Sequence, residues 1–94
     1  MQVYYLEPKN DDTSDPRWEA TFLREGCWVT AGSETLARAK VQLATLKPVP
    51  LDPEQKMLYS PWPEPRLADC WVDNRANVSV PDGVIVTLGG KTIP

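Results

Sequence analysis

Six of the ten prolines fall between Lys47 and Arg66, and this density constrains the fold more than any other feature. A proline lacks a backbone N–H and fixes φ, so neither a helix nor a central strand can run through such a segment. We therefore predict an extended, polyproline-like loop at 47–66. It is rich in apolar side chains, so we expect it to cover one edge of the core with Met57, Leu58, Tyr59 and Trp62.

The clearest helix precedes this loop, at 34–46. Ser33 can accept a hydrogen bond from a first-turn N–H, and Pro48 ends the helix because it cannot continue the hydrogen-bond pattern. Apolar side chains recur at helical spacing and predict an amphipathic helix that packs on a sheet. The predicted packing stripe consists of Leu36, Ala39, Leu43 and Leu46, widened by Ala37, Val41 and Ala44.

Short β-rich runs lie on both sides of the helix and the loop. Val and Tyr dominate 2–6, and 84–88 is a β-branched run. Apolar and polar residues alternate across 17–22, which predicts a strand that buries Trp18, Ala20 and Phe22.

The tripeptide Cys-Trp-Val occurs twice, at 27–29 and 70–72. Each copy is predicted as a strand with Trp on one face and Cys and Val on the other. Together these elements predict a single α+β domain over 1–94. Its sheet is mainly antiparallel, with about four to five strands, and the helix packs on one face.

Composition narrows the classes of partner. The net charge is −3, which argues against direct binding to nucleic acid and against an anionic membrane surface. We see no apolar run long enough to span a bilayer and no signal peptide at 1–8. These observations predict a cytoplasmic location, where both cysteines should stay free thiols.

The chain contains no histidine. The usual general base and the usual metal ligand are therefore both missing, and no catalytic or cofactor-binding residue is predicted. Cys27 and Cys70 cannot form a conventional four-ligand zinc site by themselves. We interpret both as apolar, structural cysteines, which a disulfide could join only if their strands were neighbours.

A binding surface is predicted near the end of the proline-rich loop. Trp62 stands between Pro61 and Pro63, which would hold the indole with little entropy left to lose on binding. The alternative places Trp62 in the core. The candidate partner-binding residues are Tyr59, Trp62, Glu64, Asp11 and Asp12.

Three runs carry a resemblance to other sequences: Asp-Pro-Arg-Trp, then Trp-Val-x-Ala-x-Ser-Glu-x-x-Ala-Arg, then Ser-Pro-Trp. Over residues 15–70 the chain resembles small uncharacterised bacterial and phage-borne proteins. The resemblance implies a bacterial or phage-infected host cell and no particular activity.

These features favour a small non-catalytic protein that binds another protein, as a phage or mobile-element inhibitor of a host protein would. Anti-CRISPR proteins share the profile of small size, acidic charge and many aromatics. One alternative is a structural or assembly protein acting as a homodimer through an exposed strand at 3–6 or 84–88. A second alternative is a small carboxylate-dependent enzyme.

Overall fold

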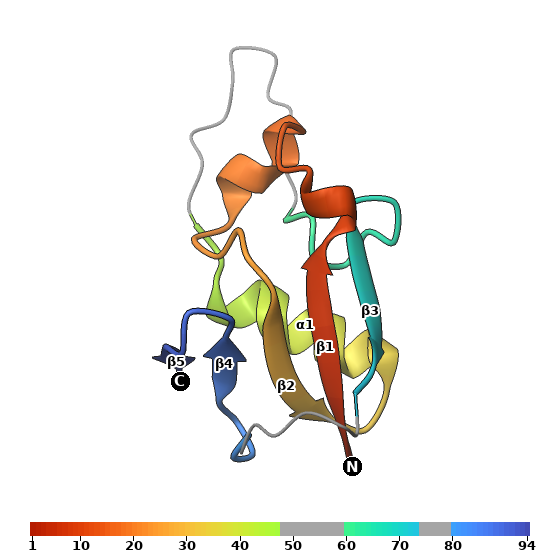
Figure 1. The fold of residues 1–94 in the computed structure, drawn as a ribbon, viewed down its shortest axis with the longest axis vertical. Helices are drawn as coiled ribbons and strands as arrows, with labels where there is room; N and C mark the ends of the chain where they lie inside the picture. Colours follow the sequence, from red (N-terminus) through yellow and green to blue (C-terminus); the bar gives the residue numbers. More distant parts are fainter. Residues whose placement is uncertain (48–59, 74–79) are drawn as a thin grey trace.

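The structure is a computed structural model that describes residues 1–47, 60–73 and 80–94. It is an α+β domain in which one helix covers one face of a five-stranded antiparallel sheet, as predicted (Figure 1). The strand order is β3-β1-β2-β4-β5. The elements are β1 (Gln2–Pro8), β2 (Cys27–Ala31), α1 (Glu34–Ala44), β3 (Ala68–Val72), β4 (Ile85–Thr87) and β5 (Thr92–Ile93).

The two Cys-Trp-Val copies flank the same strand in the same register. Tyr5 of β1 lies opposite Trp28 on one side and opposite Trp71 on the other. Leu6 likewise faces both cysteines, and Tyr4 faces both valines. Because β1 separates the two cysteines, they lie about 9–10 Å apart across the sheet, too far for a disulfide; both are free thiols.

The core lies between α1 and the inner face of the sheet and is closed at one end by two indoles. Trp18 and Trp62 meet edge to face, with ring centroids 5.2 Å apart and planes at 83°. The Trp62 indole N–H also donates to the Thr21 hydroxyl, 3.1 Å away. The other apolar members of this core are Tyr4, Leu6, Leu23, Cys27, Val29, Ala31, Ala37, Val41, Ala68 and Ile85.

The helix begins as predicted, with the Ser33 hydroxyl accepting from the Leu36 N–H at 3.2 Å, and it ends two residues early, at Ala44. The predicted stripe is confirmed at Ala37 and Val41, which are buried, but it is wrong for its leucines, which face outward; Leu43 is 74% exposed. The buried side chains of α1 are Ala37, Arg38 and Val41.

Arg38 accounts for this rotation of the helix. Its Nη1 donates to the backbone carbonyls of Trp62 at 3.0 Å and Ala68 at 2.8 Å. Buried carbonyls need a donor, and a guanidinium supplies several in one fixed plane. Satisfying both carbonyls turns Arg38 inward, and the leucine stripe consequently faces solvent.

The strand predicted at 17–22 was also wrong, because a 3-10 helix occupies Pro16–Ala20. The Asp15 carboxylate accepts from the Arg17 N–H at 2.9 Å, and a proline fits the first helical position. Trp18 and Ala20 are buried as expected, but Phe22 is 71% exposed. Local capping thus outweighs the alternating pattern.

The edges of the sheet differ from those proposed for a homodimer. Residues 3–6 belong to β1, an interior strand that is paired on both sides. Residues 84–88 include β4, which lies between β2 and β5. Among the described residues the two edges are β3 and the two-residue β5. Of the proline-rich loop, 48–59 lie outside the described residues, while Ser60, Pro61 and Trp62 are buried.

Candidate functional site

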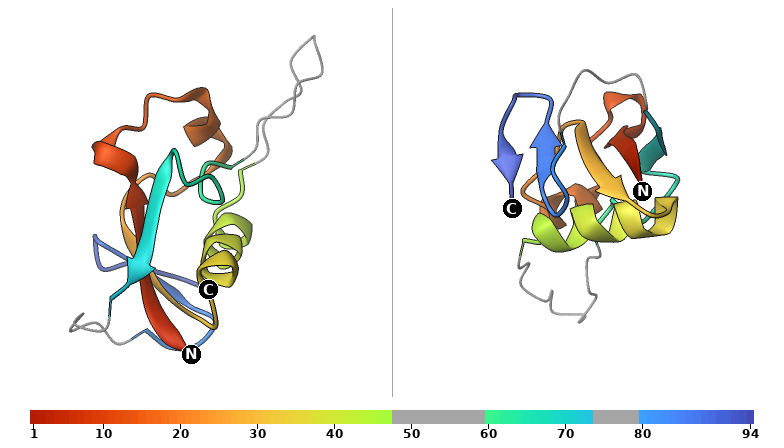
Figure 2. Two further views of the ribbon diagram at one scale, coloured as in Figure 1. Left: turned by 90° about the vertical axis from the view of Figure 1, so that its right-hand side faces the viewer. Right: turned by 90° about the horizontal axis from the view of Figure 1, so that it is seen from below.

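Within the described residues, no α-helix covers the face of the sheet opposite α1. In both views of Figure 2, α1 lies on one side of the sheet, and a short 3-10 helix at Lys9–Asp11 follows the end of β1 on the other side. The register places one continuous line of side chains across that open face, one from each strand: Trp71, Tyr5, Trp28, Val86 and Thr92. We call the first three the aromatic row.

The rings of the aromatic row touch one another. The Tyr5 ring centroid lies 5.0 Å from that of Trp28, with planes at 40°, and 5.1 Å from that of Trp71, with planes at 68°. Tilted and edge-on contacts of this kind contribute about 0.5–1.5 kcal/mol each beyond the area they bury. Tyr5 is buried between its neighbours, whereas Trp71 remains 44% exposed at the end of the row.

Gly26 makes room for the central ring. A β-carbon at this position would lie 2.7 Å from Tyr5 Cζ, closer still to the hydroxyl oxygen, and 2.9 Å from a Leu88 methyl group. The absent side chain therefore lets the hydroxyl end of Tyr5 lie against the backbone just before β2. Glycine is the residue that permits such a close approach to the backbone.

The polar ends of two rings are bound to carboxylates. The Tyr5 hydroxyl donates to Glu7 Oε2 at 3.1 Å, and Trp28 Nε1–H donates to Asp73 Oδ2 at 3.2 Å. Burial, followed by the hydrogen bond to Glu7, raises the pKa of Tyr5 well above its usual value. The hydroxyl therefore stays protonated, and the row is fixed in orientation from both sides.

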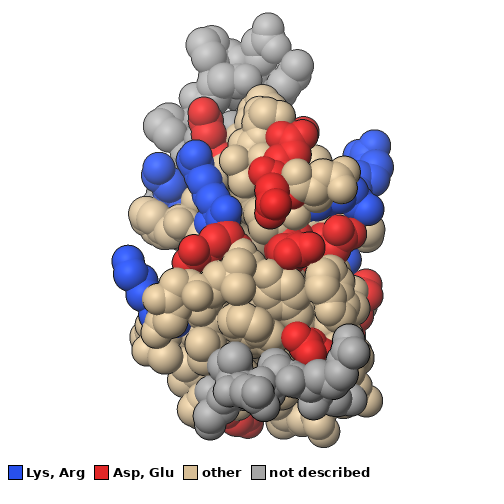
Figure 3. Space-filling model, in the orientation of Figure 1, with Lys and Arg blue, Asp and Glu red and all other residues tan. Residues whose placement is uncertain are grey.

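Acidic side chains border the row. Glu7, Asp69 and Asp73 share the open face with it, because they stand at even spacing from Tyr5 and Trp71 along their strands. Figure 3 shows this face, with Asp and Glu in a band across an uncharged region and Lys and Arg toward its flanks. Lys9 pairs with Asp69 at 3.1 Å, on an exposed site where such a pair contributes little. The aromatic row therefore lies in an acidic setting.

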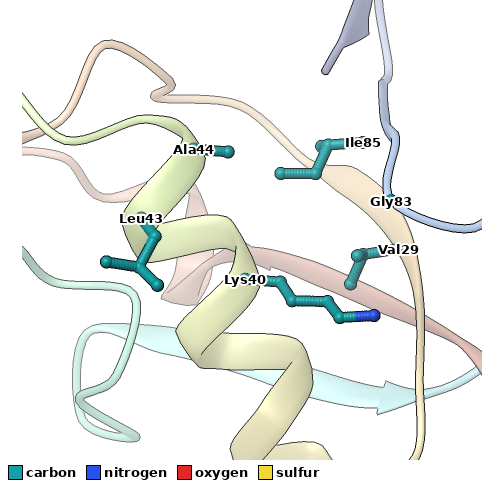
Figure 4. Close-up of a pocket in the computed structure, with 6 residues that line it drawn as sticks. All are labelled: Val29, Lys40, Leu43, Ala44, Gly83 and Ile85. Carbon is teal, nitrogen blue, oxygen red and sulfur yellow. The ribbon is translucent and has the colours of Figure 1, made fainter.

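A second feature is a hollow of about 330 Å³ between α1 and the strands β2 and β4. It is lined by Val29, Lys40, Leu43, Ala44, Gly83 and Ile85 (Figure 4). Its one charged group, Lys40, already donates to the Thr30 carbonyl at 2.9 Å and pairs with Asp82 at 3.6 Å. The other lining residues have no polar side chain to orient a ligand, so the hollow is weaker than the aromatic row as a candidate site.

Neither cysteine is set up for chemistry. Burial raises the pKa of Cys27 to about 12 and that of Cys70 to about 11. Because the thiolate is the nucleophile, these raised pKa values disfavour reaction of both thiols near neutral pH, and more strongly for the buried Cys27. Among the described residues, no group of three or more His, Cys, Asp or Glu side chains could hold a metal ion.

The structure separates the residues that the sequence had proposed for partner binding. Trp62 is 0% exposed, so its core placement is the correct alternative and it offers no surface anchor. Tyr59 lies outside the described residues. Asp11 and Asp12 are exposed in the turn after β1, and Glu64 lies in the turn before β3.

Among the described residues, the pKa values of the Asp12 and Glu64 carboxyl groups are lowered. Asp12 accepts from Ser14, and this hydrogen bond lowers the pKa of its carboxyl group. Glu64 accepts from the Arg66 backbone and side chain, which lowers its pKa as well. Carboxylates held in the ionised form are poor general acids.

The aromatic row was missed as a site in the sequence, although its signal was present. In each Cys-Trp-Val copy, the sequence had already put the tryptophan on one face of the strand and the cysteine and valine on the other face. What the sequence did not reveal is that both strands pair with β1 in one register, which joins the tryptophans through Tyr5. A repeated tryptophan-containing strand, together with another strand that carries an aromatic side chain, is the sequence pattern that would predict such a row.

No family model matches the chain, and comparison with curated proteins and with solved structures gives no match. The described part of the chain has no helix long and apolar enough to cross a membrane.

Proposed function

We propose that this domain is a non-catalytic protein-binding module whose open sheet face contacts a basic surface of another protein. The observation that carries the proposal is the aromatic row, which ends in a half-exposed tryptophan and is bordered by carboxylates. Tryptophan and tyrosine are the side chains that most often dominate protein interfaces. Rings already fixed by packing lose little freedom when a partner binds.

Charge selects the kind of partner. A row of stacked aromatics can also bind single-stranded nucleic acid, but such sites surround the rings with basic residues. Here Glu7, Asp69 and Asp73 border them, Lys9 is a basic neighbour that pairs with Asp69, and the whole chain carries a net charge of −3. Lysine and arginine from a protein could pair with these carboxylates and pack their charged groups over the rings.

A small acidic module of this kind would act by covering a functional surface of its target. An inhibitor from a phage or mobile element, directed at a nucleic-acid-binding protein of the host, is the class we favour. We place it in the cytoplasm of a bacterial or phage-infected cell, where its two free thiols would remain reduced.

The proposal is tested by comparing two exposed aromatics. The immobilised protein is incubated with bacterial lysate as wild type, as Trp71→Ala and as Phe22→Ala. We expect a retained partner that is lost with Trp71→Ala, kept with Phe22→Ala, and released by salt. Phe22 is a matched control because it is exposed but lies outside the aromatic row. A partner that survives Trp71→Ala unchanged, or the absence of any retained protein, would contradict the proposal.

A further inference from the structure

The edge strand β3 directs part of its backbone away from the sheet. The Asp73 N–H donates to the Val3 carbonyl at 2.9 Å, and the Lys9 N–H donates to the Leu67 carbonyl at 3.0 Å. In an antiparallel pair, hydrogen-bonded and non-hydrogen-bonded positions alternate. The backbone groups of Asp69 and Trp71 therefore face β1, whereas those of Cys70 and Val72 point outward.

Within residues 1–47, 60–73 and 80–94, one end of this edge is capped and the other end has no partner strand. The Ala68 N–H donates to the Glu64 carbonyl at 3.0 Å, and its own carbonyl accepts from Arg38. Cys70 and Val72 have no such partner within the described residues. In the left view of Figure 2, β3 lies nearest the viewer with no described element in front of it. A row of unpaired N–H and C=O groups is a template for a further strand.

The side chains of β3 indicate what that strand should carry. On the open face Trp71 stands between Asp69 and Asp73, two residues away on either side. If β3 paired with β3 of a second copy about Trp71, Asp69 of each copy would lie opposite Asp73 of the other. Like charges directly opposite destabilise a pair of strands, so this edge is better matched to a basic partner than to itself.

We propose that β3 accepts an extended segment of the partner protein as a sixth strand. This inference rests on the proposed function and specifies how that partner binds. The segment has the pattern basic, any, aromatic, any, basic, so that its aromatic side chain extends the aromatic row beyond Trp71. Its two basic side chains then face Asp69 and Asp73. Main-chain hydrogen bonds to Cys70 and Val72 supply affinity, and the alternate side chains supply specificity.

The probe is the synthetic peptide acetyl-Thr-Lys-Thr-Trp-Thr-Lys-Thr-amide, titrated into ¹⁵N-labelled protein. We expect hydrogen exchange at the Cys70 and Val72 amides to slow by about tenfold on binding. Replacing both lysines of the peptide with glutamate should abolish the effect. Exchange is read on the wild-type protein, so this measurement does not depend on any variant folding.

A variant pair isolates the backbone contribution. Val72→Pro removes an outward N–H without removing a bond to β1, which an edge strand tolerates. It should weaken peptide binding about tenfold, the effect of one lost hydrogen bond. Val72→Ala keeps the N–H and should bind within about twofold of wild type.

Three results would overturn the inference. If the peptide shifts Trp28 and Val86 signals while Val72→Pro binds equally well, the partner uses the face and not the edge, and the proposed function survives. If the peptide does not bind at millimolar concentration, the edge inference fails, and the lysate experiment decides the proposed function independently. If wild-type protein self-associates and Val72→Pro does not, a second copy occupies the edge instead of a basic segment.

Discussion

Tyr5 lies directly over Gly26, and the ring fills the space that a side chain on the neighbouring strand would need. One contact thus links the turn before β2 to the centre of the aromatic row. Tyr5 in turn contacts both tryptophans of the row. The position of Trp71 therefore depends on a residue two strands away.

Gly26→Ala should displace Tyr5 and disturb the row. The new methyl group would meet the ring and a Leu88 methyl group, so we expect a loss of about 1–3 kcal/mol in the free energy of unfolding. Near-UV circular dichroism should change as the rings move. Gly89→Ala is the control, because its β-carbon would lie 3.5 Å from a flexible Glu25 carboxylate. That variant should stay within about 0.5 kcal/mol of wild type, and equal effects of the two would contradict this account.

Trp62→Ala should unfold the domain far more readily than Trp71→Ala. Trp62 is fully buried against Trp18 and hydrogen-bonded to Thr21. Its removal should cost about 3–5 kcal/mol, as large-to-small core changes do. Trp71 is half-exposed, and its loss should cost about 1 kcal/mol. Urea unfolding followed by far-UV circular dichroism measures both, and the reverse order would show that the roles of these tryptophans are exchanged.

Arg38→Met should reveal how strongly one buried guanidinium ties α1 to the chain before β3. The variant keeps much of the aliphatic volume but leaves the Trp62 and Ala68 carbonyls without their donor. We expect a loss of about 3 kcal/mol, measured by chemical unfolding. Arg66→Met, at a side chain 85% exposed, should change stability by less than about 0.5 kcal/mol. Similar losses would mean that the buried bonds contribute little.

Cys27 should resist alkylation in the folded protein. Burial raises its folded-state pKa from 9.0 to about 12, so the thiol is protonated at neutral pH. Iodoacetamide at pH 8 should modify it only in denaturant, while the half-buried Cys70 should react first. Mass spectrometry with Cys70→Ala and Cys27→Ala variants separates the two sites. Rapid labelling of Cys27 in native buffer would contradict this burial.

The same shift makes stability depend on pH in the alkaline range. The folded-state pKa of Cys27 lies above its unfolded value, so its contribution is complete below about pH 9 and is lost as the pH rises toward 12. Urea unfolding at pH 7 and pH 10.5 should show a smaller decrease for Cys27→Ala than for wild type. An equal decrease in both proteins would assign the pH dependence to other groups.

The sequence predicted the secondary-structure elements of this fold better than it predicted which elements lie next to each other. The helix start at Ser33 and the strand character of both Cys-Trp-Val copies follow from local rules, and the structure has both. The 3-10 helix at Pro16–Ala20 also follows from local sequence, but the prediction gave more weight to the alternating pattern than to the Asp-Pro cap. In each case the decisive information lies within a few residues.

The candidate site depends on information that is not local. The outward turn of the leucine stripe follows from Arg38 binding carbonyls 24 and 30 positions away. The aromatic row depends on β1 lying between two strands whose tryptophans, Trp28 and Trp71, are 43 positions apart in the sequence. A hydrophobic pattern read over a short stretch of sequence does not reveal the strand order. For this reason Trp62, and not Trp71, was proposed as the surface anchor.

The duplicated Cys-Trp-Val segment has a consequence for how the chain reaches this structure. Residues Tyr4 to Leu6 meet the same three side chains on either flank, so side-chain matching alone does not determine which copy takes which side. The length of the connecting chain can make the choice between the two sides. Between β1 and the copies, 18 residues separate Pro8 from Cys27, and 59 residues separate Pro8 from Ala68. Shorter loops close at lower entropic cost. The copy at 27–29 should therefore pair with β1 first. Early pairing on one side of β1 would then disfavour a misfolded sheet in which the two copies exchange places.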